Sequence, residues 1–417
     1  MNRGKTMRIG IKLFVYIVML VGMIVVAGCA AGSVSNSSNE GASNTSEPKD
    51  TSKDASADTT FENTVNIGFS GPLSGPAAYY GENTLSGLEM AVDEINKEGF
   101  EVDGKKYGVN LVTLDDQYLP NETGTNARRL VQENDTPIVF VPHSGGVFAT
   151  QVFNEQEEFL IAAYTSEPKI MEQDNSLTLG IPPAYSAYPE AFTNYQMERF
   201  GKKIAMLPTS SQYGKDWTEA LKPVWEENGG EVVFEGSIDF SKDTDFFSIV
   251  TKALSNNPDV LFVGGPSQPT ALVIKQAREL GFEGGFMLMD QAKIEEIEPV
   301  LGGLDQLEGT IGALPIIDSD APGAEEFISQ YKERFDRIPT AEGAFNYQAM
   351  HVIVNAMSES GSVEDPTKIM ESMDAAIQSL PDEKMVWHLT GIYNGGAFDW
   401  KPAIGAVEDG KVVKVEN

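Results

Sequence analysis

Short apolar runs alternate with helical patterns along most of the chain, and this alternation constrains the fold more than any other feature of the sequence. Residues 64–70, 137–141 and 259–263 are such runs, rich in Val, Ile, Leu and Phe. A helical pattern follows each of them; in residues 84–97, for example, apolar residues recur at intervals of three or four positions. Apolar strands separated by amphipathic helices are typical of parallel sheets that are covered on both faces. The sequence therefore predicts an α/β fold.

The pattern occurs in two comparable series, residues 63–182 and 183–314, joined by a turn-rich segment with two adjacent prolines. From residue 315 the sequence is richer in helical patterns, and the chain closes with two strand patterns at 404–407 and 411–415. A length of 417 residues is enough for two or three domains of about 150 residues each. Two α/β lobes to which later segments return would form a cleft, which is the usual setting of a small-molecule site.

The first 28 residues have the features of a secretory signal peptide. Basic residues precede the apolar run 13–26, and Ala27 and Gly28 follow it, directly before Cys29. A basic region, an apolar stretch of this length and small residues at the cleavage point define such a peptide. The position of Cys29 resembles the lipobox of bacterial lipoproteins, in which this cysteine is lipidated after cleavage. We therefore expect residues 1–28 to be removed and Cys29 to carry a lipid anchor; an uncleaved transmembrane anchor is the alternative.

Residues 29–62 follow as a segment rich in Ser, Asn, Asp and Thr. It has almost no bulky apolar residues with which to form a core, so we expect a flexible tether between the lipid and the folded body. Either type of anchor places the remaining chain outside the cytoplasm, close to the bacterial cell membrane.

Charge and cysteine content exclude several classes of function. The chain has a formal net charge of −32, and its first 28 residues hold four basic and no acidic residues, so the remainder carries −36. Such a surface repels phosphate backbones, which argues against a nucleic-acid partner. One cysteine and three histidines exclude a disulfide framework within the chain and make a metal site improbable. We expect neither a metal nor a cofactor.

The sequence contains no catalytic motif that points to an enzyme. It lacks the G-x-x-x-x-G-K-[ST] phosphate loop, the H-E-x-x-H metal motif and the G-x-S-x-G nucleophile elbow. His143 and Ser144 are adjacent, so on an extended chain their side chains would point to opposite faces, which is unsuitable for a Ser–His pair. We expect a binding protein rather than an enzyme, and an extracellular hydrolase remains the other class.

Polar and aromatic residues follow the predicted strands at the ends where ligands bind in open parallel sheets, beyond the carboxyl ends of the strands. The set comprises Tyr80 (with Tyr79 as the alternative), Ser144, Tyr164, Thr165, Ser166, Tyr213 and Asp290. Hydroxyl and backbone N–H groups suit a carboxylate, whereas the carboxylate of Asp290 suits an ammonium group. The sequence therefore predicts a cleft for a small zwitterion.

Some of these residues also suit a structural role that involves no ligand. Asp290 also suits the N-cap of a helix near residues 294–300, and Ser144 the cap of a helix that begins near Val147. Tyr213 precedes a glycine and also suits a turn packed on the sheet. We interpret His143 as structural.

The stretch IGFSGPLSGPAAYYG at residues 67–81, followed by GLEMAVDEIN at 87–96, closely resembles the start of the leucine/isoleucine/valine-binding family. These are solute-binding proteins of ABC transporters. The similarity continues through Ser211-Gln-Tyr-Gly214, Gln276-Ala-Arg-Glu-Leu-Gly281 and Glu408-Asp-Gly-Lys411, and it covers nearly all of residues 64–417.

The resemblance implies the type I periplasmic-binding fold, in which two doubly wound parallel-sheet lobes are joined by a three-strand hinge. We place the crossovers near residues 182–183, 314–315 and 402–404. The N-terminal lobe then comprises 63–182 plus 315–402, and the C-terminal lobe comprises 183–314 plus 403–417.

The resemblance also implies roles for the candidate residues. Tyr80 resembles the aromatic contact of the first lobe, and Ser144 resembles the carboxylate-binding serine. Tyr164, Thr165 and Ser166 fall at a second carboxylate-binding turn, with a register that is open by one residue. Tyr213 resembles the second-lobe tyrosine, and Asp290 lies where an acidic residue holds the ammonium group of the ligand.

Two departures from the family pattern affect the size of the ligand. Tyr164 is bulkier than the small residue of the family, and Pro266 replaces an aromatic residue that often follows the Gly-Gly pair. Both put a leucine-sized specificity in question while leaving an amino-acid head group plausible.

The family resemblance implies capture rather than catalysis. An amino acid, branched-chain or related, would bind in the cleft, close the lobes and pass to the permease subunits of an ABC importer. An amide, a urea-like solute or an aromatic acid is the alternative ligand, and a sensory receptor is the alternative role. We expect an extracytoplasmic, lipid-anchored monomer.

Overall fold

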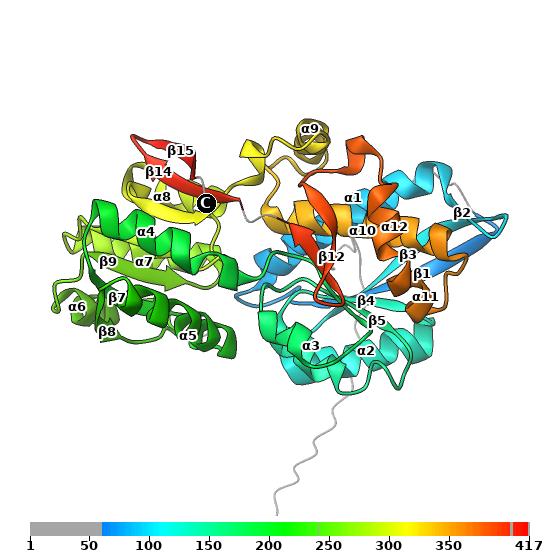
Figure 1. Ribbon diagram of the computed structural model, residues 1–417, viewed down its shortest axis with the longest axis horizontal. Helices are drawn as coiled ribbons and strands as arrows, with labels where there is room; N and C mark the ends of the chain where they lie inside the picture. The colour runs from blue at the N-terminus through cyan, green and yellow to red at the C-terminus, as the bar shows by residue number, and fades with distance from the viewer. Residues whose placement is uncertain (1–60, 241, 401–402, 416–417) are drawn as a thin grey trace, which may run out of the picture. The chain divides into compact units, whose positions relative to one another are not determined.

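The computed structural model describes residues 61–240, 242–400 and 403–415. The predicted signal peptide, Cys29 and most of the predicted tether lie outside the described residues. Within them, the strands form two sheets, and each sheet has its own set of helices (Figure 1).

The first sheet has the strand order β12-β13-β6-β5-β4-β1-β3-β2. Its strands are β1 (Asn63–Gly71), β2 (Phe100–Val102), β3 (Lys105–Asp115), β4 (Ile138–Val141), β5 (Leu160–Ala163), β6 (Thr178–Gly180), β12 (Leu389–Tyr393) and β13 (Ala397–Trp400). The pairs from β13 through β6, β5, β4 and β1 to β3 are parallel, and antiparallel hairpins lie at both edges. The residues of β4 and β5 are all buried, as expected for central strands covered on both faces.

The second sheet has the order β15-β14-β11-β10-β9-β7-β8. Its strands are β7 (Lys203–Pro208), β8 (Glu231–Glu235), β9 (Val260–Gly264), β10 (Gly285–Leu288), β11 (Thr310–Ala313), β14 (Ile404–Glu408) and β15 (Lys411–Val415). The strands from β8 to β11 are parallel, and the closing hairpin β14–β15 adds to the edge strand β11 in antiparallel orientation.

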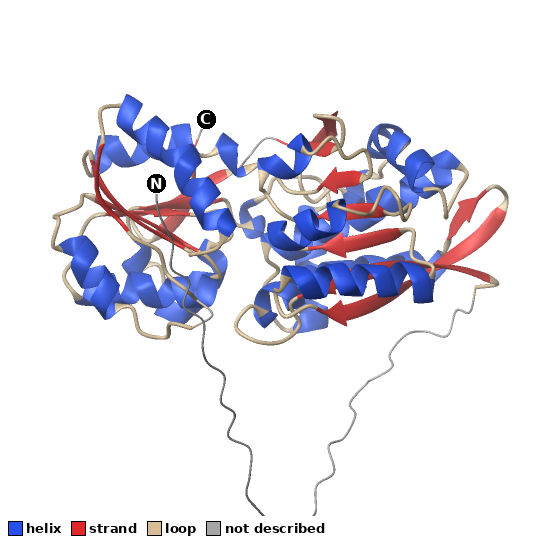
Figure 2. Ribbon diagram, turned by 90° about the horizontal axis from the view of Figure 1, so that it is seen from below, coloured by secondary structure: helices blue, strands red, loops and turns tan. Residues whose placement is uncertain are grey.

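Helices cover both faces of both sheets (Figure 2). Around the first sheet lie α1 (Ala78–Glu98), α2 (Pro120–Asn134), α3 (Ser144–Gln151), α9 (Ala324–Phe335), α10 (Ala341–Ser360), α11 (Pro366–Glu371) and α12 (Met373–Gln378). Around the second lie α4 (Pro189–Arg199), α5 (Gln212–Glu227), α6 (Phe247–Leu254), α7 (Ser267–Glu279) and α8 (Ile294–Leu301). The predicted α/β fold with two doubly wound sheets is thereby confirmed. We call the first sheet with its helices the first lobe and the second sheet with its helices the second lobe.

Alternate residues of a strand serve the two faces of a sheet. In β4, Ile138 and Phe140 pack into the core shared with α1 and α10, whereas Val139 and Val141 pack into the core shared with α2 and α3. The second lobe is built in the same way, with α4 and α5 on one face and α6, α7 and α8 on the other. Each lobe therefore has two apolar layers, and these hold the loops at the strand ends in place.

The close approach of α1 and α10 depends on two glycines. A Cβ atom placed on Gly87 would lie 2.0 Å from the carbonyl oxygen of Gly343, which is closer than real Cβ atoms approach. α10 is buried along most of its length against this neighbour. The absence of side chains at this crossing lets α10 reach the first sheet, and this placement matters because the first turns of α10 border the cavity described below.

Candidate functional site

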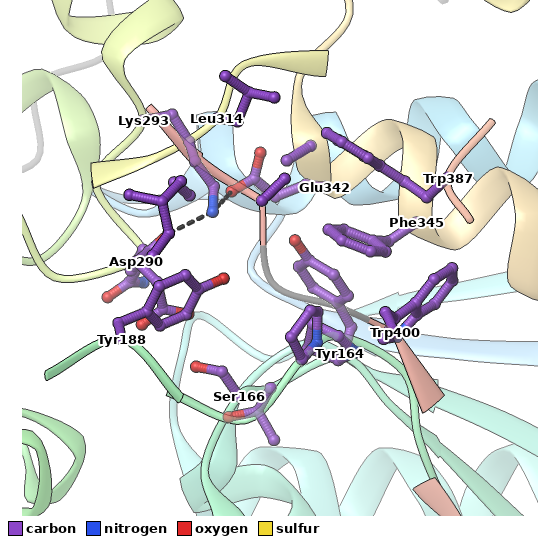
Figure 3. Close-up of a pocket in the computed structure, with 18 of the residues that line it drawn as sticks. Tyr164, Ser166, Tyr188, Asp290, Lys293, Leu314, Glu342, Phe345, Trp387 and Trp400 are labelled. Carbon is purple, nitrogen blue, oxygen red and sulfur yellow. Dashed lines mark hydrogen bonds and ion pairs between the residues drawn. The ribbon is translucent and has the colours of Figure 1, made fainter. Parts of the chain in front are cut away.

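A cavity of about 940 Å³ lies between the two lobes, beyond the carboxyl ends of the parallel strands (Figure 3). All of the residues predicted for the ligand site line it: Tyr80, Ser144, Tyr164, Thr165, Ser166, Tyr213 and Asp290. Tyr79 is not among the lining residues. The first five come from loops and helix starts of the first lobe, and the last two from the second lobe. The structure thus brings these residues together around one cavity.

A line of hydrogen bonds crosses the cavity from one lobe to the other. The hydroxyl groups of Ser166 and Tyr213 lie 3.0 Å apart, and the Tyr213 hydroxyl donates to Oδ1 of Asp290. The indole N–H of Trp217 donates to the same oxygen at 2.8 Å. Burial and the neighbouring carboxylate raise the pKa of Tyr213 well above its ordinary value, so the phenol keeps its proton and remains a donor. Asp290 is therefore held by two neutral donors in a largely buried position.

Asp290 does not cap the helix that follows it. α8 begins at Ile294, its N-cap residue is Lys293, and no side chain caps it. Tyr213 lies in the first turn of α5, whose N-cap is Ser211, with the Ser211 hydroxyl accepting from the N–H of Gly214. Asp290 and Tyr213 thus each lie shortly after a parallel strand, in the region where a loop ends and a helix begins.

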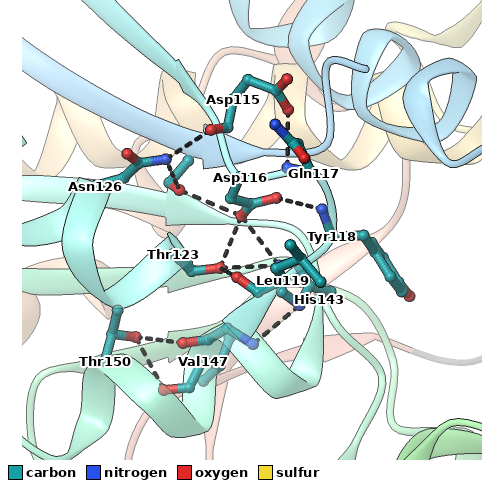
Figure 4. A network of polar contacts seen from close by, with 12 residues as sticks. Asp115, Asp116, Gln117, Tyr118, Leu119, Thr123, Asn126, His143, Val147 and Thr150 are labelled. Carbon is teal, nitrogen blue, oxygen red and sulfur yellow. Dashed lines mark hydrogen bonds and ion pairs between the residues drawn. The ribbon is translucent and has the colours of Figure 1, made fainter. Parts of the chain in front are cut away.

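Ser144 is the first residue of α3, and His143 is its N-cap. Nδ1 of His143 accepts a hydrogen bond from the N–H of Gly146 at 2.9 Å, and Nε2 lies 3.1 Å from Oδ2 of the buried Asp116. Asp116 also accepts from the backbone N–H of Tyr118 at 2.9 Å and from the Thr123 hydroxyl at 2.8 Å (Figure 4). The ring of His143 holds the start of the helix that carries Ser144, and His143 also lines the cavity, so its predicted structural role stays a prediction.

Phe345, Trp387 and Trp400, which sequence reasoning did not assign to the site, join Tyr164 in forming another wall of the cavity. The rings of Phe345 and Trp387 stack, with centroids 5.3 Å apart and planes inclined by 16°. The ring of Trp400 meets Phe345 edge to face at 4.9 Å, and the ring of Tyr164 lies 6.2 Å from it. We call Tyr164, Phe345, Trp387 and Trp400 the aromatic wall. All four line the cavity.

A buried ion pair also borders the cavity. Nζ of Lys293 in the second lobe lies 3.8 Å from Oε1 of Glu342 in the first, and it donates to the backbone carbonyl of Asp290. Both side chains are almost fully buried. Burial lowers the pKa of Lys293, but the carboxylates of Glu342 and Asp290 outweigh this effect, and the pKa is raised above its usual value. Lys293 therefore remains a cation beside the site.

Further contacts join the lobes near the cavity. Nδ2 of Asn83 in α1 donates to Oε1 of Glu296 in α8 at 2.5 Å, and Nε2 of Gln291 donates to the Tyr118 hydroxyl at 3.2 Å. Burial raises the pKa of Glu296 well above its usual value, and the charge of Glu342 adds to this effect. Residues of both lobes are therefore in direct contact beside the cavity.

Two negative observations apply to the described part of the chain. None of its clusters of His, Cys, Asp and Glu has the three or more members that a metal site needs. None of its helices combines the length and apolar character that crossing a membrane requires.

Comparisons with known proteins agree with this geometry. The model of a family described as periplasmic binding protein matches residues 64–388. A leucine-, isoleucine-, valine-, threonine-, and alanine-binding protein of Pseudomonas aeruginosa is 28% identical over 327 residues, which span 76% of this chain and 84% of the relative. A leucine binding protein of Thermotoga maritima is 23% identical with a TM-score of 0.71, covering 84% of this chain and 97% of its own.

A second solved structure shows the same fold. It is a branched-chain amino acid transporter substrate binding protein of Streptococcus pneumoniae in complex with isoleucine, 20% identical, with a TM-score of 0.70, covering 84% of this chain and 100% of its own. Together these similarities confirm the resemblance to the leucine/isoleucine/valine-binding family.

Proposed function

Because the chain belongs to the periplasmic binding protein family, we propose that it captures an amino acid between its two lobes for delivery to an ABC permease. The observation that carries the proposal is the line of hydrogen bonds from Ser166 through Tyr213 to Asp290, which joins the two lobes at the cavity and holds a buried carboxylate there. Relatives of this chain are named as binding proteins rather than enzymes, which supports capture without catalysis.

The two ends of an α-amino acid fit the two lobes. Ser144 and Thr165 offer hydroxyl groups, and the start of α3 offers backbone N–H groups, which together suit a carboxylate; Ser166 would join them by turning its proton from Tyr213 to the ligand. Asp290 suits the ammonium group, because Tyr213 and Trp217 orient its carboxylate without neutralising it. A ligand held in this way contacts both lobes at once. It therefore stabilises the closed form by its difference in affinity for the closed and the open form.

We assign residues 63–182 plus 315–402 to the N-terminal lobe and residues 183–314 plus 403–417 to the C-terminal lobe. The order of strands supports this division, because the chain leaves the first sheet after β6, returns to it after β11 and leaves again after β13. Three connections between the lobes would act as the hinge about which the cleft closes.

The location follows from the family and from the amino-terminal sequence. We propose an extracytoplasmic, monomeric protein whose signal peptide, residues 1–28, is removed and whose Cys29 holds it at the membrane by a lipid. The Cys29→Ala variant is then expected in the soluble extracytoplasmic fraction. A variant that stays with the membrane would support an uncleaved anchor instead.

Calorimetry with matched ligands tests the proposal. Leucine and phenylalanine are compared with 4-methylpentanoate and 3-phenylpropanoate, which are the same molecules without the ammonium group, and with the corresponding amino-acid amides, which lack the carboxylate. We expect binding only for molecules that have both groups. Binding of the deaminated acids with equal affinity would support an aromatic or aliphatic acid as the solute, and binding of none of the amino acids would refute the proposal.

A further inference from the structure

The aromatic wall is held rigidly, although its members come from distant parts of the chain. The buried side chain of Gln348 accepts from the backbone N–H groups of Val386 and Trp387, both at 2.9 Å, and donates to the carbonyl of Trp387 at 3.1 Å. The indole N–H of Trp400 donates to the carbonyl of Ile181 at 2.6 Å. The Gln348 bonds hold the backbone at Trp387, and the bond to Ile181 holds the indole ring of Trp400, so the wall needs little further ordering when a ligand arrives.

The wall and the proposed head-group residues lie on different sides of the cavity. In Figure 3, Asp290 and Tyr188 are on one side, and Phe345, Trp387 and Trp400 are on the other, with Tyr164 between them. A ligand whose ammonium group meets Asp290 would therefore extend its side chain toward the aromatic rings.

The cavity is large for an aliphatic amino acid. Its volume of about 940 Å³ lies near the upper end of the roughly 300–1,000 Å³ found for pockets that enclose drug-sized ligands. A short aliphatic side chain would leave part of the wall in contact with water, whereas a larger side chain would cover it and bury more apolar surface. The space therefore favours a larger side chain.

The buried ion pair beside the wall favours a neutral side chain, and, apart from the proposed head-group carboxylate, the other charged lining residues, Asp320 and Lys414, pair with each other. Glu342 is one turn before Phe345 on α10, and Lys293 lies 3.8 Å from it. A cationic side chain placed near Glu342 would be repelled by Lys293, and an anionic one near Lys293 would be repelled by Glu342. Because the ion pair has no net charge, it attracts neither a cationic nor an anionic ligand side chain.

From these observations we propose that the aromatic wall is the side-chain subsite of the cavity and that it selects α-amino acids with a neutral aromatic side chain over aliphatic ones. This inference rests on the proposed function, since it takes the amino-acid head group as given. Rings in offset or edge-to-face contact gain energy beyond that of buried area, and we expect phenylalanine or tryptophan to bind about tenfold more tightly than leucine.

The test measures dissociation constants by calorimetry for L-phenylalanine, L-tryptophan, L-leucine and L-arginine with the purified protein and two variants. Phe345→Leu removes the central ring of the wall. Phe327→Leu is the matched control, because Phe327 is buried in the same core, 4.8 Å from the ring of Tyr347, and does not line the cavity.

We expect Phe345→Leu to weaken phenylalanine by about tenfold while leaving leucine nearly unchanged, and Phe327→Leu to leave the ratio of the two unchanged. Leucine or arginine binding as tightly as phenylalanine to the unaltered protein would overturn the inference, whether or not the variants fold. An equal loss for leucine and phenylalanine in Phe345→Leu would overturn it as well. Both of these results leave the proposed function intact, whereas binding of no amino acid at all would refute both.

Discussion

Glu295 offers a direct test of lobe closure through its titration. It lies in the first turn of α8, is 3% exposed, and neither of its side-chain oxygens has a hydrogen-bond partner among the described residues. The next residue, Glu296, bonds to Asn83 of the first lobe, so this turn lies against that lobe. Burial raises the pKa of Glu295 to about 7; Glu342 adds to the rise, and Lys293 opposes it. Separation of the lobes would return water to this carboxyl.

The direction and size of the effect follow from linkage. Below its ordinary pKa of 4.5, a carboxyl whose pKa is raised in the closed form is protonated in both forms and does not change the free energy of closure. As the pH rises from there to about 7, the open form loses its proton first, and closure becomes less favourable. Each pH unit is worth about 1.4 kcal/mol, so the interval of about 2.5 units limits the loss to about 3.5 kcal/mol, or about 300-fold in ligand affinity.

The assay is the ligand dissociation constant from about pH 5 to about pH 8, where the linked group titrates. The unaltered protein is expected to bind more weakly as the pH rises. Glu295→Gln should bind more tightly than the unaltered protein at the upper pH and show a smaller slope, the remainder coming from Glu296. Glu298→Gln removes the same charge from a less buried position of α8 and should keep the original slope. A slope in Glu295→Gln equal to that of the unaltered protein would refute the reasoning.

Three other substitutions test the head-group site and the helix crossing. Asp290→Asn should weaken an amino-acid ligand by about 2–5 kcal/mol in calorimetry, through loss of a buried charge partner; an unchanged affinity would remove it from the site. Ser144→Ala should cost less, about 1–3 kcal/mol, for one hydrogen bond to a charged group. Gly87→Ala should lower the free energy of unfolding by about 1–3 kcal/mol, because its Cβ would meet the carbonyl of Gly343 at 2.0 Å. In denaturant titrations Gly124→Ala, with its nearest neighbours at 3.9 Å, should show no such loss.

The sequence predicted the architecture because the central strands are buried on both faces. A strand such as β4 needs apolar residues at every position, and this makes it visible as an uninterrupted run. Once parallel strands are recognised, topology places the residues that follow them at one edge. Ser144 after β4 and Asp290 after β10 could therefore be expected to line one cleft, although 145 positions separate them in the sequence.

The hairpin of β12 and β13 was not predicted, although its turn carries a local signal. Asn394 and Gly395 both have positive φ, of 48° and 73°, as in the turns that join two-stranded hairpins. An Asn-Gly pair between two apolar stretches is a strong hairpin indicator. Here the flanking strands are too short to give a clear strand pattern of their own. The hairpin matters for function because Trp400 lies at its end.

The proposed head-group site and the proposed side-chain subsite differ in how far sequence can predict them. The first is formed by loops that follow parallel strands, so a strand pattern is enough to place its residues. The second depends on where α10 and the late hairpin pack, and no periodicity links Phe345 to Trp387 or Trp400. Phe345, Trp387 and Trp400 lie outside the motifs that carry the family resemblance, and two of these three rings come from the last 31 residues of the chain. Relatives can therefore share the head-group chemistry and still differ in the side chain that they accept, so specificity has to be measured on this chain itself.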